Sequence, residues 1–226
     1  PHPVAKAGDN PTGFWEHLDI VALHEKFLSA AGSSWQDVSP FVSGWEHGEG
    51  AAWFRRELKE ILQRDFASPL LWVVKDPRLC RLFPLWRPVL SELGIHPGLV
   101  ILTRNPVEVA ASLQHRDGLE DTTSHLLWLQ HMLAAEKASR GSHRTFLTYS
   151  ELLNDPLSAF KKIAFDLRLN WPKPIESVQA GLRSFLAPEL RHHQATAEQT
   201  DKVSPLRGIA RRDGDHAARA GREQTW

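Results

Sequence analysis

Hydrophobic and polar positions form two kinds of pattern along the chain, and the first is a short run of apolar residues. Residues 70–74 and 99–103 are apolar almost throughout and lack the polar alternation of a half-exposed strand. Such runs are typical of strands covered on both faces. Residues 145–149 repeat the pattern more weakly. We therefore predict strands at these three places.

The second pattern is an apolar residue at every third or fourth position, which predicts amphipathic helices. Gly32 and Gly94 follow two of these segments, and glycine is the favoured residue just after a helix. Because helices separate the strands, we expect right-handed crossovers and an α/β fold, in which a mostly parallel sheet is flanked by helices in three layers. The predicted helices cover residues 19–31, 51–65, 80–93, 105–116, 122–139, 156–168 and 174–186.

Two segments of the chain show neither of these patterns. Residues 33–50 are rich in Gly, Ser and Trp and predict a long irregular loop, which is either functional, mobile or plain surface. From residue 195 onward apolar residues become scarce, so residues 195–226 predict a polar, poorly ordered tail. We expect residues 1–194 to form a single domain, since 226 residues with 42% hydrophobic content can fill one large core.

The net charge and the cysteine content limit the classes of function that the protein can have. The 27 basic and 27 acidic side chains cancel, so no global field attracts nucleic acid or an anionic membrane, and any anion site must be local. A single cysteine, Cys80, excludes an intrachain disulfide and suggests the cytoplasm, although a cysteine-poor secreted protein would look the same. No apolar run approaches the roughly 20 residues needed to span a bilayer, and the amino end does not resemble a signal peptide.

The most informative segment is the passage from the strand at 99–103 into the next helix. Asn105 suits the helix cap, Pro106 the first helical position, and Glu108 the acidic position of a capping box. Backbone donors and the helix dipole favour an anion at such a junction. Arg104 lies there, and its forked guanidinium matches phosphate oxygens.

Ser112 lies eight residues beyond Arg104, about 12 Å along a helix axis, where a long arginine side chain could reach toward it. An equally good interpretation is that Arg104 pairs with Glu108, while Ser112 only lines a helix contact. The spacing does not decide between these two interpretations.

The predicted strand at 70–74 ends in a similar way, in Lys75, Asp76 and Arg78. Two parallel strand ends would bring Lys75, Arg78 and Arg104 to one crevice, and three cations there would bind an anion. The alternative is structural: Asp76 neutralises Lys75 or Arg78 in an ion pair.

Several segments, taken together and in order, resemble one known family. Arg104, Asn105 and Pro106 followed by Ser112 look like the 3′-phosphate element of sulfotransferases that use 3′-phosphoadenosine 5′-phosphosulfate. The resemblance is to the bacterial-type branch and covers roughly residues 10–193. It implies a P-loop-like fold and transfer of a sulfonate group from that co-substrate. The other matching segments are residues 10–16, 75–78, 149–156 and 190–193.

The resemblance also implies roles for individual residues. Arg104 and Ser112 would bind the 3′-phosphate, and Tyr149 would approach the adenine. Arg78, as one of the cations expected at the crevice, is a further candidate for nucleotide binding. Alternatively, Tyr149 only ends a strand, with its ring buried. The family's phosphosulfate loop, of the type Gly-x-x-Arg-Ser-Gly-Thr, is not found in the sequence. We therefore expect the first strand of the sheet to be missing, either because residue 1 is an artificial start or because half of the donor site is lost.

Sulfonate transfer requires a base for the acceptor and a cation for the departing phosphate. Glu16 is the first candidate for the base, although it could instead cap the helix that follows it. Asp76 is the second candidate, but the neighbouring cations would lower its pKa. Lys75 would act on the bridging oxygen of the leaving group. The histidines are scattered, so we predict no metal site.

The acceptor is a small molecule or a glycan that the sequence does not identify. Four tryptophans in or near the irregular region could form its pocket, or could be ordinary core anchors: Trp15, Trp35, Trp45 and Trp53. A second hypothesis is a non-catalytic sulfotransferase-like domain that binds the nucleotide or a partner. A P-loop kinase or hydrolase is the third and weakest, because Gly-x-x-x-x-Gly-Lys-Ser/Thr is lacking.

Overall fold

The computed structural model describes residues 15–186 of the chain. Within this range the chain divides into two compact units: residues 15–103 together with 129–186, and residues 104–128. The predicted tail, residues 195–226, lies outside the described residues. Each unit is described by itself.

The first unit contains a parallel pair of strands, β1 (Leu99–Thr103) and β2 (Arg144–Thr148). Their register runs from Leu99 opposite Arg144 to Thr103 opposite Thr148. The prediction of an α/β fold with a parallel sheet and flanking helices is confirmed at this level. The strand predicted at 99–103 has the observed bounds, and the strand predicted at 145–149 is shifted by one residue.

The prediction of a strand at residues 70–74 is wrong. These residues form an irregular segment, in which Leu70 and Val73 are exposed to solvent. Trp72 and Val74 turn inward and pack against the core. A buried strand needs a hydrogen-bonded neighbour, and over residues 15–186 the sheet consists of β1 and β2 only. Only part of the apolar run is therefore used in packing.

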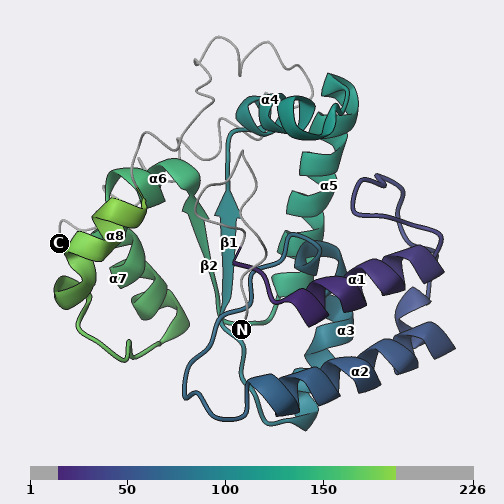
Figure 1. Ribbon diagram of the computed structural model, residues 1–226, viewed down its shortest axis with the longest axis horizontal. Coiled ribbons are helices and arrows are strands. Elements are labelled where there is room, and N and C mark those ends of the chain that lie inside the picture. The colour runs from purple at the N-terminus through teal and green to yellow at the C-terminus, as the bar shows by residue number, and fades with distance from the viewer. Residues whose placement is uncertain (1–14, 187–226) are drawn as a thin grey trace, which may run out of the picture. The chain divides into compact units, whose positions relative to one another are not determined.

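Helices lie on both sides of the strands in the first unit. Figure 1 shows α1, α2 and α3 on one side, and α6, α7 and α8 on the other. The second unit contains α4 (Pro106–Asp117), and α5 (Asp121–Ser139) runs from the second unit into the first. The remaining helices are α1 (Leu18–Ala30), α2 (Glu49–Asp65), α3 (Leu79–Glu92), α6 (Tyr149–Asn154), α7 (Pro156–Leu167) and α8 (Gln179–Phe185), with short 3-10 turns at Trp45–His47 and Ile175–Val178.

Six of the predicted helices agree with observed ones to within about two residues at each end, which is the usual uncertainty of helix boundaries. The helix predicted at 174–186 is instead a 3-10 turn followed by α8. None of the helices in the described part of the chain is both long and apolar enough to cross a bilayer.

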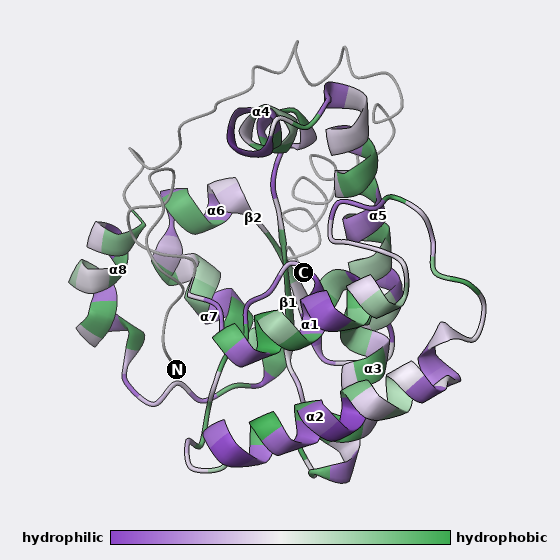
Figure 2. Ribbon diagram, turned by 45° about the vertical axis from the view of Figure 1, so that its right-hand side comes forward, coloured by the Kyte–Doolittle hydropathy of each residue, from purple (hydrophilic) through white to green (hydrophobic). Residues whose placement is uncertain are grey.

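The larger core of the first unit lies between α1, α2 and α3. Phe54 and Leu58 of α2 and Leu82 of α3 are fully buried there, and Leu99 of β1 packs at the margin. The exposed positions of α2 are mostly polar, and Figure 2 shows hydrophilic and hydrophobic bands alternating along this helix. Burial of each large apolar side chain contributes about 1.5–3 kcal/mol, so this cluster is the main source of stability in the unit.

A smaller cluster packs α7 against β2. It consists of Leu147 of β2 with Ala159, Ile163 and Leu167 of α7. Gly98, just before β1, lies against the same helix, because a Cβ atom at this position would come within 3.0 Å of Leu167 Cδ1. The smaller cluster thus fixes one face of β2 to the helix that follows it.

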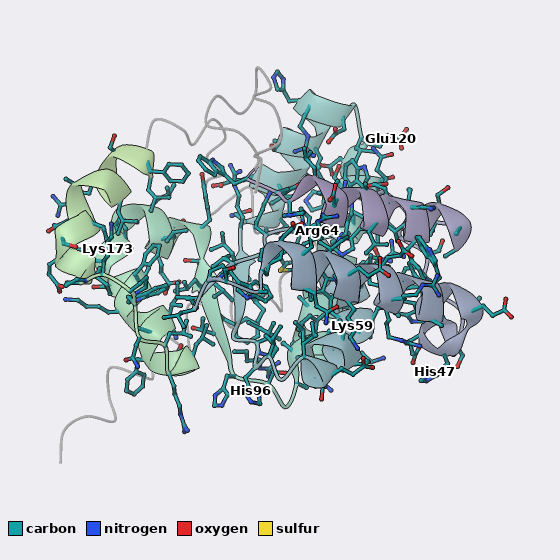
Figure 3. The ribbon with its side chains drawn as sticks, turned by 60° about the horizontal axis from the view of Figure 1, so that its bottom comes forward. His47, Lys59, Arg64, His96, Glu120 and Lys173 are labelled. Carbon is teal, nitrogen blue, oxygen red and sulfur yellow. The ribbon has the colours of Figure 1, made fainter. Side chains whose placement is uncertain are left out.

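Ion pairs on α2 lie at the surface of the first unit. Lys59 and Arg64, labelled in Figure 3, pair with Glu92 of α3 and Asp19 of α1 respectively. Exposed pairs of this kind contribute about 0–1 kcal/mol each. They join α2 to α3 and α1 at the surface and contribute little to the stability of the unit.

The irregular segment predicted at residues 33–50 is held in place by one side chain, Arg81 of α3. Its Nη1 atom donates to the carbonyl oxygens of Ser34 and Asp37 at 3.0 Å, and Nη2 donates to that of Ser39 at 3.2 Å. The guanidinium also stacks over the Phe41 ring. Arg81 is only 6% exposed. The first part of the loop is therefore anchored to α3 by charge-assisted hydrogen bonds.

Candidate functional site

Residues 75–78 lead into α3 and carry three of the predicted site residues. Asp76 is the central one and is only 6% exposed. Its Oδ1 atom accepts hydrogen bonds from the backbone N–H of Arg78 at 2.9 Å and from Nη1 of Arg78 at 3.0 Å. The structural alternative, an ion pair between Asp76 and Arg78, is therefore present in the molecule.

The other oxygen of Asp76 is part of a buried polar chain that the sequence analysis missed. His24 of α1 lies 2.8 Å from Asp76 Oδ2 through Nδ1, and Trp86 of α3 donates from Nε1 to His24 Nε2 at 2.9 Å. An indole can only donate, so Nε2 of His24 must be the unprotonated nitrogen. Nδ1 then carries the proton and donates it to Asp76. The hydrogen bonds thus assign a neutral His24 beside an ionised Asp76.

The surroundings of Asp76 favour its ionised form. Burial by itself would raise the pKa of Asp76, but the hydrogen bond from His24 and the donors of Arg78 outweigh it and hold that pKa below its usual value. Both oxygens of the carboxylate already accept hydrogen bonds. Asp76 is therefore an anion at neutral pH, and it is poorly suited to accept a proton from a substrate.

Lys75 pairs with a different carboxylate, Glu16. Lys75 Nζ donates to Glu16 Oε1 at 2.5 Å, and the Glu16 side chain is largely buried while that of Lys75 is half exposed. Two of the predicted catalytic residues, 59 positions apart in the chain, are thus in direct contact. The alternative role of Glu16 as a helix cap is not observed, since α1 begins after His17 without a side-chain cap.

Arg78 bridges two carboxylates, because it also donates from Nε to Glu25 of α1. Burial works to lower the pKa of Arg78, but Asp76 and Glu25 together raise it above the usual value. The guanidinium therefore stays charged. We call Glu16, Glu25, Lys75, Asp76 and Arg78 the 75–78 cluster; it consists of the pair of Lys75 with Glu16 and the pairs of Arg78 with Asp76 and Glu25.

The second unit holds Arg104 and Ser112. As predicted, Asn105 caps α4: its Oδ1 accepts from the backbone N–H of Val107 at 2.9 Å. Arg104 donates from Nε to Glu108 at 3.0 Å, so the ion pair considered in the sequence analysis is present. Glu108 is buried, and Ser112 lies half-buried about one further turn along α4. The ion pair with Glu108 thus holds the Arg104 side chain near the start of the helix.

Tyr149 is the first residue of α6 rather than the last residue of a strand. A capping box formed by Thr148 and Glu151 begins this helix. β1 and β2 end at the same position of the ladder, where Thr103 lies opposite Thr148. Arg104 directly follows Thr103 in the chain, and Tyr149 directly follows Thr148. Tyr149 itself is half-buried.

The structure brings together some of the predicted site residues. Glu16, Lys75, Asp76 and Arg78 gather in the 75–78 cluster of the first unit. Arg104 and Ser112 belong to the second unit. The convergence of Lys75 and Arg78 with Arg104 therefore stays a prediction.

The tryptophans divide into two groups. Trp35, Trp45 and Trp53 are partly buried and pack against the larger core, which agrees with their interpretation as core anchors. Lys26 lies 4.7 Å from the centre of the Trp53 ring. Trp15 is exposed and has its edge toward Phe185 of α8. Of the four, Trp15 is the one most accessible to an acceptor.

Over residues 15–186, no group of three or more His, Cys, Asp or Glu side chains is arranged to hold a metal ion. Comparison with family models, with curated proteins and with solved structures gives no match to the chain. A functional assignment must therefore be argued from the residues and their geometry.

Proposed function

We propose that the protein is a sulfotransferase, which transfers a sulfonate group from 3′-phosphoadenosine 5′-phosphosulfate to a hydroxyl or amine of a small-molecule or glycan acceptor. The observation that carries the proposal is the end of β1, where the chain passes through Arg104 into the capped start of α4. A cation at the carboxyl end of a parallel strand, beside a helix amino terminus, favours a phosphate. We place the domain in the P-loop-like three-layer architecture, and the reaction in the cytoplasm, which suits the single cysteine.

Four residues are assigned to nucleotide binding. Arg104 and Ser112 hold the 3′-phosphate, and the ion pair with Glu108 orients the guanidinium of Arg104 for it. Arg78 adds positive charge for the phosphates, and Tyr149, which follows the end of β2, lies against the adenine. The nucleotide is a co-substrate, and no metal is part of the proposal.

The pair of Lys75 and Glu16 supplies the acid–base chemistry. Lys75 turns its ammonium group to the bridging oxygen of the phosphosulfate, where it stabilises the charge that develops as the S–O bond to phosphate breaks. Glu16 accepts the proton of the acceptor as the new S–O or S–N bond forms. Asp76 is the weaker candidate for the base, because His24 and Arg78 occupy both of its oxygens.

Titration of the protein with 3′-phosphoadenosine 5′-phosphate tests the nucleotide site. We expect binding that Arg104→Ala weakens by about 1.5–3 kcal/mol, the range of hydrogen bonds to a charged group. Adenosine 5′-monophosphate lacks the 3′-phosphate, so Arg104→Ala should leave its affinity unchanged. Arg116→Ala, in the last turn of the same helix, is the matched control. Equal loss for both nucleotides, or for both variants, would remove the assigned role of Arg104.

A second candidate is a domain of this kind that binds the nucleotide without transferring a group. It is favoured by one observation: Lys75, Asp76 and Arg78 each have a carboxylate or histidine partner inside the protein. Transfer of ³⁵S from labelled 3′-phosphoadenosine 5′-phosphosulfate to a panel of phenols, sugars and amines separates the two candidates. Transfer that Glu16→Gln abolishes supports the enzyme, whereas nucleotide binding without transfer to any acceptor supports the binding domain.

A further inference from the structure

The outer side of β2 and the end of α7 enclose an open groove of about 1060 Å³, which the proposed function does not use. All of the groove lies in the first unit. The residues that matter for its chemistry are Arg144, Phe146, Lys162, Phe165, Asp166 and Arg168.

The backbone of β2 is open toward this groove. Leu99 N–H donates to the carbonyl of His143 at 2.9 Å, so His143 faces β1. Backbone groups alternate in direction along a parallel ladder, so Thr145 and Leu147 also face β1, while Arg144 and Phe146 point their N–H and C=O groups outward. In the described part of the chain no strand pairs with that outer edge. Such an edge is a template for a further strand.

The open stretch has a defined end. The N–H of Thr148, which points to the same side as that of Phe146, is bound by Glu151 Oε2 of the capping box at 2.7 Å. Strand addition is therefore blocked at Thr148 and limited to the residues before it. The groove can take a short extended segment rather than a whole sheet.

The side chains around the open edge combine apolar area with positive charge. Phe165 is 86% exposed and Phe146 is 42% exposed. Three cations line the groove, Arg144, Lys162 and Arg168, against one carboxylate, Asp166, which Lys162 already neutralises. Arg144 also pairs with Glu136 of α5, so Arg168 is the cation that leaves a net positive charge in the groove. This net charge favours an acidic segment.

Arg168 has an unusual backbone conformation. It ends α7 in the left-handed region at φ 54°, where glycine is the favoured residue. A residue with a side chain is strained in this region, because its Cβ atom comes close to the following carbonyl oxygen. An arginine at this position keeps a cation beside the groove at a cost in stability. Residues with strained backbone angles are concentrated at active sites and ligand-binding sites.

We propose that this groove binds an extended acidic segment of a partner protein, which adds to the open edge of β2 as a further strand. Its backbone pairs with the outward N–H and C=O groups of Arg144 and Phe146. Its carboxylates lie against Lys162 and Arg168, and its apolar side chains, which alternate with them, cover Phe146. Main-chain hydrogen bonds supply the affinity, and the charges select the partner.

The test uses the full 226-residue chain and a fluorescein-labelled peptide of alternating Glu and Val, measured by fluorescence anisotropy. We expect saturable binding that a peptide of alternating Lys and Val does not show. Lys162→Glu and Arg168→Glu should each weaken it at least tenfold. The matched control is Lys161→Glu on the same helix, which pairs with Glu176 outside the groove and should change the affinity less than twofold.

Phe146→Pro tests the strand geometry itself. Proline removes only the outward N–H of residue 146, so pairing with β1 stays intact and binding of the acidic peptide should be lost. The circular dichroism spectrum and the affinity for 3′-phosphoadenosine 5′-phosphate check that the variant is folded. If it is not, Arg168→Glu carries the test alone. No binding of the acidic peptide, equal effects of Lys161→Glu and Lys162→Glu, or self-association of the protein through this edge would each overturn the proposal.

Discussion

Replacing Asp76 by asparagine tests the buried polar chain most directly, because the substitution keeps the shape of the side chain and changes only its hydrogen bonding. The two carboxylate oxygens accept from His24 on one side and from Arg78 on the other. An amide offers one acceptor and one donor group in their place. Whichever way the amide is oriented, its NH₂ group therefore faces a donor. His24 cannot resolve the conflict by changing tautomer, because Nε2 would then present a proton to the N–H of Trp86.

The expected loss follows from these contacts. A hydrogen bond to a charged group contributes about 1.5–3 kcal/mol, and a buried donor without an acceptor costs about 1–3 kcal/mol. Because Arg78 keeps its pair with Glu25, part of the charge stays compensated. We expect Asp76→Asn to lower the free energy of unfolding by about 3 kcal/mol. With a slope near 2 kcal/mol per molar urea, the midpoint of denaturation falls by about 1.5 M.

Urea denaturation at pH 7.5, followed by tryptophan fluorescence, measures this loss. Asp19→Asn is the control, because Asp19 pairs with Arg64 at the surface and should contribute less than about 1 kcal/mol. The folded pKa of Asp76 is lowered, so its contribution is complete above the unfolded value near 3.9 and is lost as the pH falls through the folded value. The difference between wild type and variant should thus be constant from pH 6 to 8 and shrink below about pH 4. A loss no larger than that of Asp19→Asn would refute the reasoning.

Two further predictions concern α3. Arg81→Lys should release the segment at residues 33–41, because one ammonium group cannot replace the guanidinium that binds three carbonyl groups. Limited proteolysis should then cleave this segment at least tenfold faster than in the wild type. An unchanged rate of cleavage would contradict the anchoring role of Arg81. Burial raises the pKa of the Cys80 thiol to about 11. Iodoacetamide at pH 8 should therefore alkylate this thiol about 100-fold more slowly in the folded protein than in urea. Equal rates of alkylation would contradict the burial of Cys80.

Local signals predicted the start of α4 correctly. Asn105 and Pro106 act within a few residues of their own position, so the cap and the first turn can be identified from the sequence. The bounds of the strand at 99–103 were also correct, but the expectation that both of its faces are covered was wrong, because Ile101 is buried while Val100 and Leu102 are exposed. Residues 70–74 form a similar apolar run but no strand, since a strand depends on a neighbour that the local sequence does not specify.

The buried polar groups were the part of the candidate site that the sequence analysis missed. His24 occupies an apolar position of α1, between Leu23 and Phe27, and that position alone indicates a buried histidine in need of partners. Its partners Asp76 and Trp86 are 52 and 62 positions away, so no spacing rule identifies them. Lys75 and Glu16 were both selected for catalysis, but their contact depends on the tertiary fold.

The chain of hydrogen bonds from Trp86 through His24 to Asp76 also has a consequence for evolution. Each residue of this chain acts as a donor or an acceptor in a defined hydrogen bond. A substitution at one position is therefore tolerated only when the neighbouring positions change in a compensating way. In relatives of this protein, we expect these three positions to covary as a set, with all three either kept or exchanged together for apolar residues.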